Sequence, residues 1–385
     1  MFKRLLGTIL IGAFGSLTWL LVAPTSLSQD AKPPKRSMAP FDRSLFDRKD
    51  LVFGSEIGAW DQDGGTALKN PQDRSHIRDA RIRIIRWGLW AKFEYMQEGG
   101  STPRQTLARF NEVVDGIADV GAIPCIKLPP IWPKQGDAAI DAWNIGWLKE
   151  IVKNAGKRVP LYEFANEPDW YQKWDAATYS AHWKRVVPEL KKYARSQGFE
   201  IFVGGPAMAN SYPQNVAYLE EFLKQTAAAY RESGNRDVVP DFVSSHTYLT
   251  EKENSTPASM LARIDAWGNF YDQVRRAIDS AYQGLNDPSG KPLAPQIKIA
   301  DSEFNYTINN KNTLAEDQAY ADAYVQAMYR MLRRHDVWMA NIFTIASHKG
   351  GALDLLNADG SPKPLYKSFK AVSLSDPFNA PRVQK

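Results

Sequence analysis

The sequence predicts an α/β protein of the (β/α)₈ class, a TIM barrel. Eight short apolar runs recur along the chain, and their starts lie roughly 30 to 55 residues apart, which leaves room for a helix and two loops each time. Runs that are almost continuously apolar indicate parallel strands buried on both faces. Eight such strands are the number that closes a barrel. The expected strands span residues 51–57, 82–89, 122–128, 160–165, 201–204, 241–246, 297–301 and 337–345.

The segments between these runs have the helical period. Apolar side chains recur there at three- and four-residue intervals, which predicts amphipathic helices. An open, doubly wound sheet is the alternative, but it usually has a Gly-rich phosphate loop, and no G-x-G-x-x-G or Walker pattern follows any of the runs. The helical intervals are clearest at 107–117, 218–223, 261–271 and 320–332.

The composition is that of a globular protein with many aromatic side chains. The 385 residues are 44% hydrophobic and 24% charged, and they include 12 Trp, 16 Tyr and 17 Phe. Such a length fits two average domains or one large barrel. The formal charge of +5 is small and is concentrated near the beginning of the chain. No basic stripe with interleaved aromatic residues is present, so nucleic acid is not an expected partner.

The first residues are typical of an export signal. Lys3 and Arg4 precede an apolar run over 5–22, and small residues follow near Ser28. We therefore expect a signal peptide at 1–28 and a secreted, periplasmic or cell-envelope protein. An uncleaved anchor that tethers the protein to a membrane is the alternative, because the run is long for a signal and short for a spanning helix.

The remaining organisation follows from composition. Residues 29–50 are rich in Pro, Lys, Arg and Ser and are interpreted as a linker or arm. The catalytic barrel is expected at 51–375 and a tail at 376–385. The single cysteine, Cys125, lies in an apolar run and has no intrachain partner, so we interpret it as a small buried hydrophobe. No H-E-x-x-H, cysteine cluster or EF-hand loop is present, so neither a metal nor a cofactor is expected.

Two carboxylates follow predicted strands on the same face of the barrel. The fourth run ends in Asn166-Glu167-Pro168, where the proline cannot continue a sheet ladder, and the seventh run is followed by Glu303. The carboxyl ends of all eight strands converge on one face of a barrel. Glycoside hydrolysis needs such a pair, one acid to protonate the leaving oxygen and one carboxylate to attack the anomeric carbon or activate water. A turn in which Asn166 caps the next helix is the alternative.

Other polar residues at the strand ends fit the same chemistry. Arg86 and Tyr248 are expected to lower the pKa of Glu303, one by its charge and the other by a hydrogen bond. Asn166 is a candidate to bond a sugar hydroxyl, and His246 is a candidate to contact the acid or the substrate. Arg86 as a purely structural ion-pair partner and His246 as a hydrogen-bonded interior residue are the alternatives.

Aromatic residues lie on loops that leave this face. Their rings could stack on the apolar faces of sugars, or they could pack in the core. The candidates for substrate binding are Trp90, Trp132 and Trp170, with Trp174 nearby.

Four segments resemble those of clan A glycoside hydrolases. Residues 162–168 are similar to the Asn-Glu-Pro strand, and residues 299–305 are similar to the seventh-strand segment of that clan. Residues 85–88 are similar to its second-strand arginine motif, and residues 246–248 to its His-x-Tyr motif. The closing segment 353–366 is similar to the end of family 39 members, which include β-xylosidases, iduronidases and exopolysaccharide endohydrolases.

The resemblance implies a retaining glycosidase in which Glu167 is the acid/base, Glu303 is the nucleophile and Asn166 binds the substrate. An endo-acting enzyme on an exopolysaccharide or β-glycan is the first expectation, and a monomer without cofactor is expected. An exo-acting β-xylosidase and an inactive barrel that only binds polysaccharide are the alternatives. One departure stands out, because clan members usually place a Trp at the end of strand eight and residues 341–348 contain none.

Overall fold

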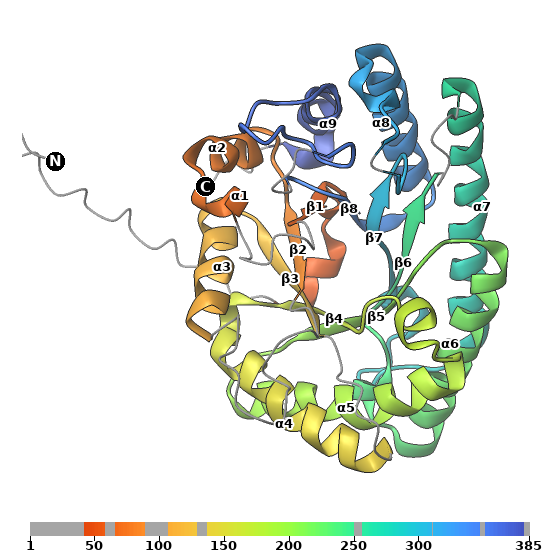
Figure 1. Cartoon of the computed structure of the whole chain (residues 1–385). Coiled ribbons are helices and arrows are strands. Elements are labelled where there is room, and N and C mark those ends of the chain that lie inside the picture. Colours follow the sequence, from red (N-terminus) through yellow and green to blue (C-terminus); the bar gives the residue numbers. More distant parts are fainter. Residues whose placement is uncertain are drawn as a thin grey trace, which may run out of the picture. The chain divides into compact units, whose positions relative to one another are not determined.

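The computed structural model describes residues 42–57, 66–88, 107–128, 137–249, 256–309, 311–346 and 351–380. Eight parallel strands in these ranges form a closed barrel in chain order, with β8 paired to β1 (Figure 1). The predicted TIM barrel is therefore confirmed. The strands are β1 Gly54–Glu56, β2 Ile84–Gly88, β3 Ile123–Leu128, β4 Leu161–Phe164, β5 Phe202–Met208, β6 Phe242–Tyr248, β7 Lys298–Asn305 and β8 Val337–Ile342.

Three strands continue beyond the apolar runs that predicted them. The runs stop at residues 204, 246 and 301, whereas β5, β6 and β7 extend to Met208, Tyr248 and Asn305. The added residues in β6 and β7 include Glu303 and Thr247, both buried. Polarity marked them as loop in the sequence, but neighbouring strands of a closed barrel supply hydrogen bonds that let polar side chains stay inside.

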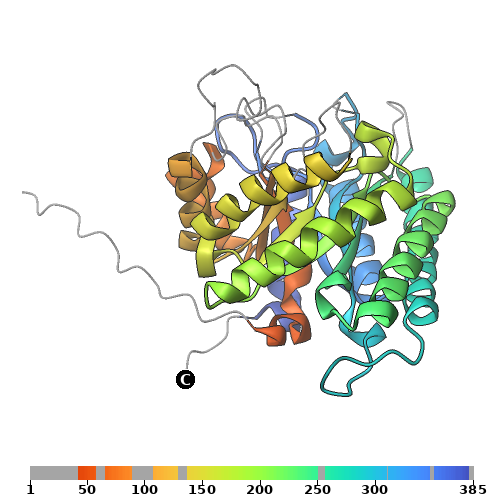
Figure 2. The ribbon, with the colours of Figure 1, turned by 90° about the horizontal axis from the view of Figure 1, so that it is seen from below.

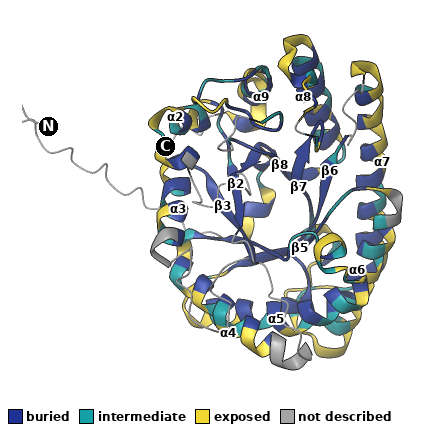
Figure 3. Ribbon diagram, in the orientation of Figure 1, coloured by how far each residue is buried: buried dark blue, intermediate teal, exposed yellow. Residues whose placement is uncertain are grey.

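Helices surround the barrel, with their buried faces toward the strands and their exposed faces outward (Figure 3). Several begin at side-chain caps that satisfy free backbone N–H groups. Asp175 accepts from Thr178 N at 2.8 Å, and Asp317 accepts from Tyr320 N at 2.8 Å. The helices are α1 Thr66–Lys69, α2 Pro71–Asp79, α3 Leu107–Asp119, α4 Asp137–Ala155, α5 Ala176–Ser196, α6 Pro213–Ser233, α7 Pro257–Ala281, α8 Gln318–Arg334 and α9 Pro364–Ser375.

The amino end of the barrel is closed by a segment that the sequence assigned to the arm. A 3₁₀ helix, η1 (Arg43–Asp47), buries Leu45 and Phe46 against the first residues of the strands. The Phe46 ring lies 4.9 Å from that of Phe202 and 4.8 Å from that of Trp338. Figure 2 shows this first described segment, in orange-red, at one end of the barrel. The packed domain therefore includes residues that precede the predicted boundary at 50.

The end of the chain also packs against the domain. In the predicted tail, Asn379 is buried and accepts a hydrogen bond from Arg83 Nε at 2.5 Å. The predicted signal and most of the predicted arm lie outside the described residues. Within the described ranges, no helix combines the length and apolarity needed to cross a bilayer.

Candidate active site

The backbone turns sharply where β4 ends. Ala165 and Glu167 both have left-handed backbone conformations, with φ of 74° and 48°. Such conformations cost non-glycine residues about 1–3 kcal/mol and concentrate at functional sites. The Glu167 carbonyl accepts from Trp170 N at 3.0 Å and Tyr171 N at 2.8 Å, which starts a short π-helix, Pro168–Gln172. The turn aims Asn166 and Glu167 at the barrel mouth.

The helix-capping alternative for Asn166 is wrong. Its side-chain Oδ1 accepts a hydrogen bond from Arg86 Nη2 at 2.8 Å, across the barrel mouth. The next long helix, α5, is capped by Asp175 instead. Asn166 therefore belongs to the polar cluster inside the barrel.

The two predicted acids lie side by side. His246 Nδ1 lies 2.7 Å from Glu167 Oε1 and 3.7 Å from Glu303 Oε2. One carboxylate oxygen of Glu167, one carboxylate oxygen of Glu303 and one ring nitrogen of His246 all lie within 4.8 Å of one another. His246 is paired in register with Glu303 on β7, so the closed sheet places it between the two carboxylates.

The same three residues are a chemically reasonable ligand set for a metal, with two carboxylates and one imidazole. Both oxygens of Glu303 already have other partners, however. Its Oε1 pairs with Arg86, and its Oε2 accepts from Tyr248 OH at 2.8 Å. This geometry therefore fits two carboxylates held by hydrogen bonds to neighbouring side chains better than it fits a metal centre.

A buried ion network holds Glu303 in place. Arg86 is fully buried and contacts three carboxylates, those of Glu56, Glu163 and Glu303. Its Nε donates to Glu163 at 2.6 Å. Lys127 Nζ donates to Glu56 at 2.6 Å and lies 3.9 Å from Glu303. Because Arg86 also bonds Asn166, one guanidinium orients four side chains from the ends of three strands, β1, β4 and β7.

The network sets the charge states of the site. Burial raises the pKa of Glu303, but the charges of His246, Arg86 and Lys127 and the Tyr248 hydrogen bond outweigh it, so the pKa lies well below its usual range. Glu303 is therefore ionised, as a nucleophile must be.

Neighbouring groups respond to that charge. Burial and the charge of Glu303 raise the pKa of Glu56, against the opposing effect of Lys127 and Arg86. Burial lowers the pKa of His246, but Glu303 and Glu167 outweigh it, so the pKa is raised above its usual value. His246, between the two acids, is therefore protonated more readily than a free imidazole.

Two members of the network, Glu56 and Lys127, were not among the predicted site residues. Both were visible as charged residues at the ends of the first and third apolar runs. Charged residues at these points were a usable signal, because inward-facing strand ends of a barrel meet. Glu163 is fully buried inside the barrel and pairs with Arg86.

The predicted aromatic residues divide into three groups. Trp170 lies on the π-helix after Glu167 with 59% of its surface exposed, and Lys173 Nζ lies 4.2 Å from its ring centre. Trp174 stacks on His182 at 4.2 Å, so it packs against α5. Trp90 and Trp132 lie outside the described residues.

Phe343 follows β8, where the clan usually has a tryptophan. It is 4% exposed, and its ring meets the Tyr248 ring edge-on with a centroid separation of 6.3 Å. Since Tyr248 bonds Glu303, the Phe343 ring packs against a residue that contacts the predicted nucleophile.

The fold and the site together define the class of protein, a (β/α)₈ barrel with one carboxylate just after β4 and a second on β7. No family model matches the chain. A β-xylosidase of Caldicellulosiruptor saccharolyticus is 24% identical over 257 residues, which are 61% of this chain and 45% of that protein. The chain thus spans less than half the length of the curated relative it matches.

Solved structures show the same fold. A monomeric β-xylosidase of Caulobacter crescentus CB15 matches with a TM-score of 0.55 and 16% identity, over 89% of this chain and 70% of that one. A family 39 glycoside hydrolase of Bacteroides cellulosilyticus WH2 matches with a TM-score of 0.57 and 18% identity, over 85% and 64%. The predicted resemblance to family 39 of clan A is confirmed at the level of the fold.

Proposed function

We propose that the protein is a retaining glycoside hydrolase that cleaves β-glycosidic bonds of a polysaccharide. The observation that carries this proposal is the proximity of Glu167 and Glu303, whose side-chain oxygens approach within 4.8 Å. Retaining glycosidases hold their carboxyl groups about 5–5.5 Å apart, whereas inverting enzymes need about 6.5–9.5 Å to admit a water. The short separation of Glu167 and Glu303 supports direct attack by one carboxylate on the anomeric carbon.

In the proposed reaction, Glu303 attacks the anomeric carbon and the bond to the leaving oxygen breaks. Glu167 gives its proton to that oxygen, which leaves a covalent glycosyl-enzyme and an ionised Glu167. Glu167 then takes a proton from water, and the resulting hydroxide attacks the anomeric carbon and displaces Glu303. Arg86 and Tyr248 stabilise the free carboxylate of Glu303 before attack and after release.

The roles can be tested by separate Glu303→Ala and Glu167→Ala variants on a β-linked aryl glycoside. Each should lose activity by about 10²-fold or more. Azide should rescue them with opposite products, an α-glycosyl azide with Glu303→Ala and a β-glycosyl azide with Glu167→Ala. Glu189→Ala, which removes a partly exposed carboxylate paired with Lys149 on the outer helices, is the control. Identical anomers from the two variants would contradict the assignment.

Endo action on an exopolysaccharide or β-glycan is the finer proposal. The exposed Trp170, three residues after the proposed acid, supports endo action, because an indole ring there can stack on a sugar beyond the cleaved bond. Exo action as a β-xylosidase is the second candidate, favoured by the name of the matched Caldicellulosiruptor protein. A polysaccharide panel separates them: endo action yields intermediate lengths early, and exo action releases only short products. Binding without cleavage would point to an inactive barrel.

We also propose export to the periplasm, cell envelope or exterior, and a monomeric state. The basis for export is the sequence pattern at residues 1–28. Sequencing the amino terminus of the mature protein distinguishes a cleaved signal from a retained membrane tether. Light scattering on the purified protein measures its mass, and a dimer mass would contradict the monomer.

A further inference from the structure

The pairing of β4 with β5 continues past the end of β4 to the proposed acid. Inside the sheet, Glu163 lies in register with Gly204, and the same spacing places Glu167 opposite Met208. In a parallel ladder, such a residue donates its N–H to the residue before its partner, and its carbonyl accepts from the residue after that partner. The first of these bonds is present, because Glu167 N donates to Ala207 O at 2.9 Å.

The second bond of this pair is made by a side chain. The Glu167 carbonyl is occupied by Trp170 N and Tyr171 N, the contacts that start the π-helix. Ala209 N, which the ladder would direct to that carbonyl, donates to Asp169 Oδ1 at 3.1 Å. The Asp169 side chain therefore replaces the diverted carbonyl and joins the π-helix to the loop that follows β5.

This link lies beside two strained residues. Glu167 and Ala207 both have left-handed backbones, with φ of 48° and 54°, and Ala207 lies where β5 shifts register against β6. Non-glycine residues keep such conformations only where the surrounding structure over-determines them. Ser244 Oγ fixes one of them, because it accepts from Ala207 N at 3.1 Å. The two bonds to β5 and its loop, one at Glu167 N and one at Asp169 two residues later, fix the other.

Asp169 makes its contact from a half-buried position. Burial raises the pKa of its carboxyl, although the hydrogen bond from Ala209 N acts in the opposite direction. The contact requires an oxygen that accepts a hydrogen bond and no particular charge, so the amide of an asparagine can also make it. An aliphatic side chain of the same size cannot.

We propose that Asp169 is a positioning residue that holds Glu167 in place for proton transfer to the leaving oxygen. The inference rests on the proposed function, because Asp169 acts only through the acid/base. Loss of its oxygen frees the π-helix from the loop after β5 and lets the Glu167 carboxyl move away from the leaving oxygen. Glu303 is held by Arg86 and Tyr248, so its attack on the anomeric carbon does not depend on this link.

Two aryl β-glycosides of one sugar, chosen from glucosyl, xylosyl and cellobiosyl forms, test the proposal. Cleavage of a phenyl glycoside needs the proton of Glu167, whereas dinitrophenolate leaves without one. The value of kcat/KM reports formation of the glycosyl-enzyme. Asp169→Ala should lower kcat/KM for the phenyl glycoside about 10- to 100-fold, because a displacement of about 1 Å can cost about 10²-fold in rate.

The dinitrophenyl glycoside should respond differently to Asp169→Ala. Its kcat/KM should stay within about threefold of the unaltered protein, since its leaving group needs no acid. Its kcat and KM should fall together, because Glu167 must still deprotonate water in the second step. Asp169→Asn keeps the oxygen acceptor and should restore kcat/KM for both glycosides to within about threefold. Asp169→Leu, similar in size but without an oxygen, replaces the alanine variant if that variant does not fold.

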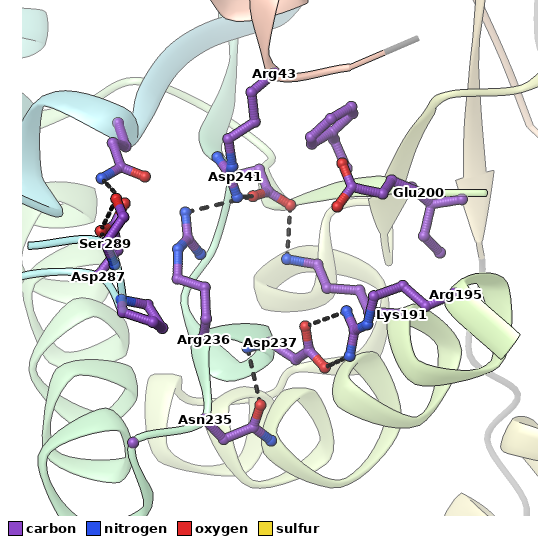
Figure 4. Close-up of a pocket in the computed structure, with 15 residues that line it drawn as sticks. Arg43, Lys191, Arg195, Glu200, Asn235, Arg236, Asp237, Asp241, Asp287 and Ser289 are labelled. Carbon is purple, nitrogen blue, oxygen red and sulfur yellow. Dashed lines mark hydrogen bonds and ion pairs between the residues drawn. The ribbon is translucent and has the colours of Figure 1, made fainter. Parts of the chain in front are cut away.

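Two other aspartates that accept from backbone N–H groups are the controls. Asp175, the cap of α5, accepts from Thr178 N at 2.8 Å. Asp287 accepts from Ser289 N at 2.8 Å in a turn at the amino end of the barrel, opposite the proposed active site (Figure 4). Asp175→Ala and Asp287→Ala should change kcat/KM for the two glycosides by the same factor.

Equal losses for the two glycosides in Asp169→Ala, or no recovery in Asp169→Asn, would overturn the proposal. Glu167→Ala, measured beside them, keeps the proposed function separate. A selective loss for the phenyl glycoside in Glu167→Ala but not in Asp169→Ala would leave the acid/base role intact and remove only the role of Asp169. An unaltered chain that cleaves none of the glycosides would overturn the proposed function and this inference with it.

Discussion

Replacing Arg86 with methionine tests the buried ion network most directly. The change removes a fully buried guanidinium and leaves Glu56, Glu163 and Glu303 with Lys127 as the remaining nearby cation of the network. Three charge-assisted contacts at about 1.5–3 kcal/mol each would add to roughly 4.5–9 kcal/mol. Contacts that share one donor group are not additive, and breaking a buried pair costs about 3–5 kcal/mol. We expect Arg86→Met to lower the free energy of unfolding by about 3–5 kcal/mol at pH 7.

The loss should shrink as the pH falls. In the unaltered protein the pKa of Glu303 is lowered, so its stabilising contribution is present above the unfolded-state pKa and is lost only when pH falls through the folded-state value. Without Arg86 the pKa of Glu303 rises, because only His246, Lys127 and the Tyr248 hydrogen bond remain to oppose the effect of burial. If it rises above the unfolded value, the folded variant binds the proton more readily and gains up to about 1.4 kcal/mol per pH unit for each proton taken up.

Urea titrations followed by tryptophan fluorescence at pH 7 and pH 5.5 measure both effects. Arg195→Met is the matched control, since Arg195 also makes a bidentate pair but is 48% exposed at its side chain. Its loss should stay below about 1 kcal/mol. A loss for Arg86→Met below about 1 kcal/mol at pH 7, or an equal loss at both pH values, would refute the reasoning.

Two further changes probe the site with less effect on the fold. Tyr248→Phe removes the 2.8 Å hydrogen bond to Glu303 and one of the interactions that lower its pKa, so the acid limb of kcat/KM should move to higher pH. The value of kcat/KM should fall about 10- to 100-fold. A profile that keeps its acid limb would contradict this. Trp170→Ala removes an exposed ring, so KM should rise for long substrates more than for short ones, while the unfolding free energy changes by less than about 0.5 kcal/mol. Equal changes in KM for all chain lengths would exclude the proposed stacking role.

The sequence alone was sufficient to predict the barrel and the two acids. Strand and helix periodicities are local properties of the chain, so the eight runs and the helices between them were recognisable without tertiary information. Glu167 and Glu303 followed because polar residues directly after the apolar runs of a barrel gather at its mouth. The ends of β6 and β7 were predicted too early, since polar residues inside a barrel mouth look like loop in a linear pattern. The end of β5 was predicted too early because Gly205 and Pro206 interrupt the strand pattern.

Beyond the expected pair of Arg86 and Glu303, tertiary structure decided which charges meet. Glu56, Arg86, Lys127 and Glu163 come from the first four strands, and only the register of the closed sheet brings them together around Glu303. The left-handed turn at Glu167 was equally hidden, because its cost is compensated by contacts from distant residues such as the hydrogen bond from Glu167 N to Ala207 O. The closure of the barrel's amino end by η1 was also decided by tertiary structure. Burial of Leu45 and Phe46 depends on strand starts far away in the chain, which no local pattern near residue 45 records.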